Sequence, residues 1–186
     1  RDAEMKPWQH LKTICHHRRL VRQGCFRVGL YWQGLTHDLS KFSPTEFWSG
    51  AKYFQGNRSP NSAQREAEGY SVAWMHHKGR NRHHYEYWTD ILPGTGKYGP
   101  VPMPRKYLAE MVMDRRAACM TYEGKNYTPA SPLAYFSRSK ERHFMHPQTA
   151  RELEFLLTML KEKGEKETFA FIRSTVLTGK PFAEEN

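Results

Sequence analysis

Several histidine and acidic residues of this sequence could together bind a single metal ion. His37 directly precedes Asp38 at the end of the apolar stretch LYWQGLT. Neutral imidazole and carboxylate suit divalent transition metals such as Mn, Fe, Zn, Co and Ni. Two ligands do not hold an ion, so other segments must contribute, and an earlier stretch offers His17 while a later one offers Asp114. The pattern predicts a metal site built from distant segments.

Histidine is frequent in the chain and unevenly distributed. The chain has 10 histidines, and adjacent pairs stand at 16–17, 76–77 and 83–84. The segment HHKGRNRHH, residues 76–84, holds two of these pairs among basic side chains. This clustering singles out residues 76–84 as a second part of the candidate site.

Helical patterns cover most of the chain that would position these residues. Apolar residues spaced three and four apart, together with capping signals, predict helices over 4–23, 28–42, 70–79, 104–122, 147–163 and 167–177. The stretch SPTE, residues 43–46, has the composition of a capping box with proline in the first turn, so another helix begins there. Polar, Gly-rich or Pro-rich composition predicts irregular structure at 55–69, 92–104 and 122–132. No strand pattern of useful length is visible, so we predict an all-α fold of six to eight helices.

Composition limits the class of protein. A chain of 186 residues is expected to form one domain, and no apolar run reaches the roughly 20 residues of a membrane-spanning helix. No basic and apolar leader is visible. The three cysteines lack CxxC spacing, which argues against a disulfide framework or a thiolate zinc site and favours the reducing cytoplasm. The formal charge of +10 favours phosphorylated partners, including nucleotides and nucleic acid.

The order His, His-Asp, Asp on expected helices resembles the HD-domain superfamily of metal-dependent phosphohydrolases. LYWQGLTHDLSKF is similar to the apolar helix of that superfamily that ends in His-Asp and a nearby basic residue. More narrowly, HLKTICHHRRLV, HDLSKFSPTEF, HHKGRNRHHYEYW and EMVMD together resemble an uncharacterised HD-like family of bacteria and phages. The resemblance implies a single HD-like helical domain over 1–186. Its metal-site core would lie at about 10–125, with C-terminal helices at 147–178 packed on it.

The resemblance also implies roles for individual residues. The ligands of a first metal would be His17, His37, Asp38 and Asp114. Asp38 would bridge to a second ion if two bind, and His76 and His77 are the best placed further ligands, although the histidine spacing departs from the usual binuclear pattern. Glu110 would act as a base or hold a ligand histidine, and His83 and His84 would act as acid/base groups or phosphate contacts. Asp38 and Lys41 complete the implied catalytic set, and the implied substrate-binding residues are Arg18, Lys41, Lys78, Arg80 and Asn81.

These features predict a metal-dependent phosphohydrolase, either a phosphomonoesterase or a phosphodiesterase. It would use a metal-activated water on a nucleotide or another small phosphoester. Two alternatives stay open. Some HD-fold proteins carry two irons and activate oxygen, and the histidine-rich second site permits this. The basic charge and the arginine-rich stretch 18–27 also permit a helical nucleic-acid-binding module, although no known nucleic-acid motif is present.

Overall fold

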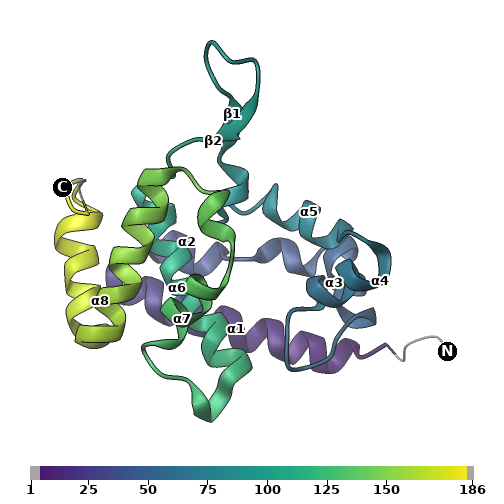
Figure 1. The fold of residues 1–186 in the computed structure, drawn as a ribbon. Helices are drawn as coiled ribbons and strands as arrows, with labels where there is room; N and C mark the ends of the chain where they lie inside the picture. The colour runs from purple at the N-terminus through teal and green to yellow at the C-terminus, as the bar shows by residue number, and fades with distance from the viewer. Residues whose placement is uncertain (1–4, 184–186) are drawn as a thin grey trace.

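Helices make up most of the protein in the computed structural model, which describes residues 5–183 (Figure 1). Within these residues there are eight α-helices and one two-stranded sheet, so the predicted all-α fold of six to eight helices is confirmed. The α-helices are α1 (Pro7–Val28), α2 (Tyr31–Thr36), α3 (Pro44–Lys52), α4 (Pro60–Glu68), α5 (Val72–Lys78), α6 (Arg105–Glu123), α7 (Ser131–Arg138) and α8 (Pro147–Phe171). The shorter elements are the 3-10 helices η1 (Leu39–Phe42), η2 (Tyr85–Tyr87), η3 (Gly124–Asn126) and η4 (Glu141–His143), the π-helix η5 (Ile172–Val176), and the strands β1 (Thr89–Ile91) and β2 (Tyr98–Pro100).

The core forms where α1 packs against α6, with α8 covering α6 from another side. Val21 of α1, Val112 of α6 and Leu157 of α8 are completely buried. Burial of one such aliphatic side chain contributes about 1.5–3 kcal/mol relative to exposure. Since α1 also carries His17 and α6 carries Asp114, the packing that makes the core fixes two candidate ligands relative to each other.

Residues 55–69 are not irregular as predicted, because α4 lies within them. The Ser59 side chain caps this helix by accepting a hydrogen bond from the Asn61 amide, and Pro60 stands in the first turn. Gly69 ends the helix in the left-handed conformation, at φ 82°. The polar residues, proline and glycine that predicted a loop therefore mark the two ends of a helix.

The sequence shows no strand pattern of useful length, and the structure adds one small sheet to the all-α fold. β1 and β2 form an antiparallel hairpin that projects from the helices, and its register pairs Asp90 with Gly99 (Figure 1). Part of the stretch 92–104 is thus regular. Strands of three residues are too short for alternation of polar and apolar residues to be visible in the sequence. At 122–132, η3 and the start of α7 replace the expected irregular segment.

The two helices predicted at the C-terminal end are confirmed, and they meet at Gly164. This glycine takes φ 74° and ψ −178° inside α8, which is not a helical conformation. Positive φ is readily accessible to glycine because it has no Cβ. The second segment of α8 runs back beside the first and ends in η5 (Figure 1).

Two expectations about the class of protein are met within residues 5–183. None of the helices there is both long and apolar enough to cross a membrane. Cys15, Cys25 and Cys119 are all free thiols, and the last two are buried.

Gly24 controls how closely α1 approaches α6. A Cβ atom at this position would lie 2.7 Å from Met113 Sδ and 3.2 Å from Met113 Cγ. We predict that Gly24→Val lowers the free energy of unfolding by about 1–3 kcal/mol, because the added methyl groups overfill a packed interface. Denaturant unfolding followed by circular dichroism measures this.

Gln23→Val on the exposed face of the same helix is the matched control for Gly24→Val. It introduces the same β-branched residue without a packing clash, so we expect a change of about 0.5 kcal/mol or less. Equal effects of the two substitutions would contradict the close approach of α1 and α6.

Candidate metal centre

A turn at His37 and Asp38 places two neighbouring side chains in one site. α2 ends at Thr36, and the chain then takes an extended ψ of 126° at His37 and a left-handed conformation at Asp38, with φ 54° and ψ 28°. Aspartate is one of the few non-glycine residues that adopt this conformation. The single helix predicted over 28–42 is therefore wrong. The turn matters because adjacent side chains diverge on a helix, whereas here both enter the same space.

Arg18 holds this turn in place. Its Nε donates to the His37 carbonyl oxygen at 2.8 Å, and its Nη2 donates to the Leu35 carbonyl oxygen at 3.0 Å. The guanidinium also lies over the Phe42 ring, 5.1 Å from its centroid. The sequence predicted a substrate contact for Arg18, but these interactions give it a structural role.

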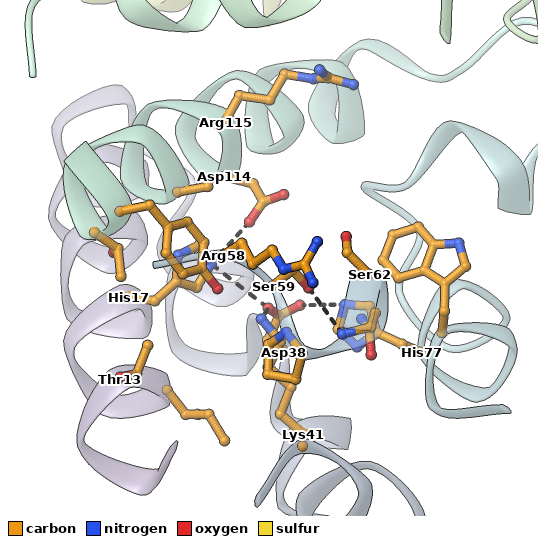
Figure 2. Close-up of a pocket in the computed structure, with 18 of the residues that line it drawn as sticks. Thr13, His17, Asp38, Lys41, Arg58, Ser59, Ser62, His77, Asp114 and Arg115 are labelled. Atoms are coloured by element: carbon orange, nitrogen blue, oxygen red, sulfur yellow. Dashed lines mark hydrogen bonds and ion pairs between the residues drawn. The ribbon is translucent and has the colours of Figure 1, made fainter. Parts of the chain in front are cut away.

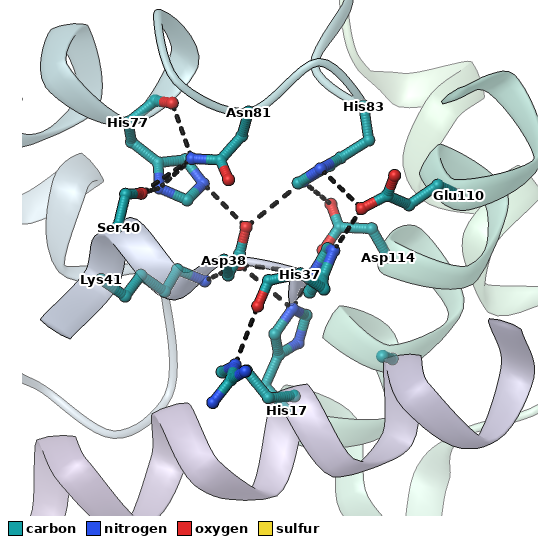
Figure 3. Close-up of polar contacts among 12 residues, drawn as sticks. His17, His37, Asp38, Ser40, Lys41, His77, Asn81, His83, Glu110 and Asp114 are labelled. Carbon is teal, nitrogen blue, oxygen red and sulfur yellow. Dashed lines mark hydrogen bonds and ion pairs between the residues drawn. The ribbon is translucent and has the colours of Figure 1, made fainter. Parts of the chain in front are cut away.

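The four side chains predicted for a first ion come together from three segments (Figure 3). His17 Nε2 on α1 lies 2.9 Å from Asp114 Oδ1 on α6 and 3.7 Å from Asp38 Oδ2. His37 Nε2 lies 3.3 Å from Asp114 Oδ1 and 3.4 Å from Asp38 Oδ2. One ligand atom from each residue lies within 4.8 Å of the others. We call His17, His37, Asp38 and Asp114 the first ligand group.

Asp38 also belongs to a second ligand group, with His77, His83 and His84. Its Oδ1 lies 3.3 Å from His77 Nε2 and 3.4 Å from His83 Nε2. His84 Nε2 lies 2.9 Å from His77 Nε2. The two carboxylate oxygens of Asp38 thus face different groups. His83 and His84, which the sequence suggested as acid/base groups or phosphate contacts, lie where ligands of a second ion would be.

Glu110 lies behind both groups and contacts two histidines at once. Its Oε1 is 2.9 Å from His37 Nδ1 and 3.1 Å from His83 Nδ1. Burial raises the pKa of Glu110, but hydrogen bonds from the two imidazoles outweigh burial, and the pKa falls below its usual value. An ionised carboxylate accepts hydrogens from both Nδ1 atoms, which leaves the Nε2 lone pairs directed at Asp38. Of its two predicted roles, Glu110 therefore has the geometry to hold ligand histidines.

Glu46 likewise contacts the Nδ1 atoms of the two histidines of α5. Its Oε2 lies 2.7 Å from His77 Nδ1, and its Oε1 lies 2.6 Å from His76 Nδ1. His76, a predicted ligand, thus contacts Glu46 and belongs to neither ligand group. Asn81, a predicted substrate contact, donates from its buried amide to Ser40 Oγ and to the His77 carbonyl oxygen, both at 2.8 Å. The sequence identified Glu46 only as part of a capping box.

Buried polar atoms without hydrogen-bond partners lie at this centre. Among the described residues, they include His37 Nε2, His83 Nε2 and Asp38 Oδ1. Each such atom costs about 1–3 kcal/mol. A neutral imidazole Nε2 that faces a carboxylate oxygen at 3.4 Å needs a cation between the two atoms, which either a proton or a metal ion supplies. The residues therefore fit a divalent transition metal, for which imidazole nitrogen and carboxylate oxygen are suitable donors.

Burial and nearby charges together determine the pKa values of the histidines in the centre. Burial lowers the pKa of His17 and His84, so both are neutral ligands. Burial is the largest effect on His37 and His77 as well, but the charge of Asp38 and hydrogen bonds to carboxylates together outweigh it and raise their pKa above the usual value. A metal ion must displace protons from these two imidazoles, so its affinity is expected to rise with pH.

A cavity of about 670 Å³ opens beside the ligands, and Lys41 lines it with Asp38 and Asp114 (Figure 2). Lys41 Nζ lies 2.6 Å from Asp38 Oδ2. Burial lowers the pKa of Lys41, but the charges of Asp38 and Asp114 and the hydrogen bond to Asp38 together outweigh burial and raise it, so the ammonium stays charged. The predicted position of Lys41 in the site is thus supported.

Two other predicted substrate contacts lie outside the cavity wall. Lys78 is half-buried at the end of α5, and Arg80 is exposed, with its Nη1 donating to the His76 carbonyl oxygen at 3.2 Å. The cations that do line the cavity besides Lys41 are Arg58, Arg65 and Arg115. Sequence reasoning missed these arginines, two of them because residues 55–69 were expected to form a surface loop.

Residues 6–159 match a family of unknown function, DUF5662. The chain belongs to the DUF5662 family. All members of both ligand groups lie within the matched residues, so the centre is part of the region that this family has in common. No curated protein and no solved structure matches the chain.

We predict that Glu110→Gln weakens metal binding by about 10–100-fold, because the neutral amide no longer holds both Nδ1 hydrogens. Competition against a coloured chelator measures the affinity, and circular dichroism checks that the helices persist. Glu162→Gln, at an exposed position of α8, is the control and should bind metal like the wild type. If both variants matched the wild type, Glu110 would not be positioning the ligands.

Proposed function

We propose that this protein is a metal-dependent phosphohydrolase, a phosphomonoesterase or phosphodiesterase that acts on a nucleotide or another small phosphoester. The observation that carries the proposal is buried Asp38, whose two oxygens face two ligand groups beside an open cavity. One or two Mn, Fe, Zn, Co or Ni ions suit these ligands. The order of His17, His37–Asp38 and Asp114 supports kinship with the HD-domain superfamily. The free cysteines agree with a cytoplasmic location.

The proposed chemistry divides between the metal and the protein. When bound, a divalent ion lowers the pKa of a water molecule and polarises a phosphoryl oxygen. The first ligand group would hold one ion and the second group another, with Asp38 common to both. Glu110 and Glu46 keep the Nε2 atoms of the ligand histidines turned toward the centre.

Lys41 supplies a fixed positive charge next to the ligands. Its ammonium is held 2.6 Å from Asp38 and remains charged because of that carboxylate. A cation already in place neutralises phosphoryl oxygens without a rearrangement of the site during the reaction. Lys41 is therefore the residue that we assign to the phosphoryl group.

His84 is suited to bind a metal. It is neutral because burial, followed by the charges of His83 and His77, holds its pKa well below the usual value. A neutral imidazole cannot donate the proton that a leaving group requires. A strongly lowered pKa also makes His84 a weak base, so of the roles predicted from the sequence it fits neither acid nor base well, and its geometry favours a ligand.

A di-iron oxygenase is the second candidate function. The two ligand groups share a single carboxylate and are rich in histidine, a donor set that suits iron as well as manganese. Metal content and reaction products separate the candidates, since oxygen-dependent turnover with two irons favours the oxygenase and phosphate release favours the hydrolase.

We predict that Asp38→Asn abolishes metal retention and lowers phosphate release by about a hundredfold or more, since it removes the charge common to both groups. Asparagine tolerates the left-handed conformation at this position, so the turn should persist. Asp38→Ala removes the same charge but adds a backbone cost of about 1–2 kcal/mol, and should be less stable than Asp38→Asn. Element analysis and a phosphate-release screen over nucleotides and sugar phosphates measure these outcomes.

The wild-type protein is the reference for this experiment. If it retained no transition metal after loading with each candidate ion, both the hydrolase and the oxygenase proposals would fail. If Asp38→Asn retained metal and activity like the wild type, the ligand assignment would be wrong.

A further inference from the structure

The wall of the cavity differs in charge from one side to the other. One side is formed by residues 57–65, which we call the α4 wall (Figure 2). The polar residues with which it lines the cavity are Asn57, Arg58, Ser59, Asn61, Ser62 and Arg65. Among the described residues of this wall there is no carboxylate. The side formed by η2, α6 and η4 instead combines Arg115 with Glu86, Glu123 and Glu141.

Arg58 is held in place and keeps donors to spare. Its Nη1 and Nη2 lie 2.5 and 2.6 Å from the two carboxylate oxygens of Glu66, and its Nε donates to Gln55 Oε1 at 2.7 Å. A guanidinium has five N–H donors, and these contacts use three of them. The ion pair with Glu66 therefore fixes the plane of the guanidinium and leaves two donors for a ligand.

Three neighbours add donors that other residues do not use. Ser62 and Arg65 are three residues apart on α4 and so lie on the same side of the helix. Within the described residues, the side chains of Asn61, Ser62 and Arg65 make no hydrogen bond or ion pair. The α4 wall thus presents guanidinium, amide and hydroxyl donors together, which is the chemistry that binds phosphate.

We propose that the α4 wall is a second anion site, which binds a phosphate group of the substrate other than the one that reacts at the metal centre. The substrate would be a small molecule with two phosphate groups. The cavity of about 670 Å³ has room for much more than one phosphoryl group. A second anionic group avoids the side that carries Glu86, Glu123 and Glu141, so it lies at the α4 wall. Hydrolysis of the bound molecule rests on the proposed function, whereas binding of a phosphate group at the α4 wall does not.

The test compares substrates that differ by one phosphate group. Suitable pairs are fructose 6-phosphate with fructose 1,6-bisphosphate, and adenosine 5′-monophosphate with adenosine 3′,5′-bisphosphate. Loss of charged hydrogen bonds in the double variant Arg58→Gln/Arg65→Gln should raise KM for the bisphosphates by about 10–100-fold. KM for the monophosphates should change less than about threefold, and kcat should stay the same, because the metal centre is intact.

Arg22→Gln is the matched control for each single variant, since it removes one positive charge from an exposed position of α1 outside the cavity wall. It should leave KM unchanged for both members of each pair. The single variants Arg58→Gln and Arg65→Gln should each show part of the effect. Equal rises in KM for mono- and bisphosphates, or an equal effect of Arg22→Gln, would overturn the second anion site and leave the hydrolase proposal standing.

Calorimetric titration with pyrophosphate tests the anion site without any reaction. The wild type should bind pyrophosphate at least about tenfold more tightly than the double variant. Equal binding by both proteins would overturn the proposal. If binding depended on the two arginines but no phosphoester were hydrolysed, the anion site would stand and the proposed function would fail.

Discussion

The buried carboxylate of Asp38 is the feature around which the structure is organised. Its residue is only 1% exposed, and its backbone takes a left-handed conformation. An ionised carboxylate in the interior is very costly unless charges and hydrogen bonds compensate it. Compensation comes from α1, α5, η1 and residues 83–84, each of which brings an imidazole or an ammonium to the same place. The contacts that form the site therefore also tie these elements together, in addition to the apolar packing of the core.

The relative positions of the candidate ligands are well fixed because most of them lie on packed helices. His17 and Asp114 lie on the two helices that make the core, and Glu110 lies one turn from Asp114 on the same helix. Arg18 ties the His37–Asp38 turn to α1 through two carbonyl oxygens. Ligands on such elements keep their geometry better than ligands on mobile loops. A change in the packing of α1 against α6 is thus also a change in the ligand distances.

The long helices could be predicted because they depend on local patterns, whereas the first ligand group could be predicted because its order along the chain resembles a known metal-binding pattern. Apolar residues three and four apart located α1, α6 and the first part of α8, and the order of His17, His37, Asp38 and Asp114 identified four candidate ligands that the fold brings together. The turn at Asp38 could not be predicted, since the apolar spacing continues through it and aspartate is allowed in either conformation. The short strands and α4 were missed for a similar reason, because segments of three to nine residues carry too few positions for a periodic signal.

The second ligand group could be predicted only in part, as the histidine cluster of residues 76–84, and its members could not be chosen, for a different reason. His76 and His77 are adjacent on α5, and nothing local says which of them faces Asp38. The choice depends on where Glu46 stands, since it binds both Nδ1 atoms and leaves only His77 Nε2 at the centre. Likewise, His83 enters the site because Glu110 receives its Nδ1 hydrogen from across the fold. Contacts between elements distant in the chain decide which histidine enters the site, and the spacing of residues along the chain does not reveal these contacts.

The sum of formal charges at the centre affects how strongly it would attract an anionic substrate. The chain is basic overall, at +10, yet its candidate site combines four carboxylates with one lysine, from Asp38, Glu46, Glu110, Asp114 and Lys41. Without an ion, protons on His37, His77 and His83, whose pKa values are raised, balance the excess of negative charge. If these protons leave, one divalent ion leaves the centre with a net negative charge, and two give it a net positive charge. An anionic phosphoester is attracted to the centre more strongly in the second case. The balance of charges therefore favours two ions, which is the number that the division of ligands around Asp38 also suits.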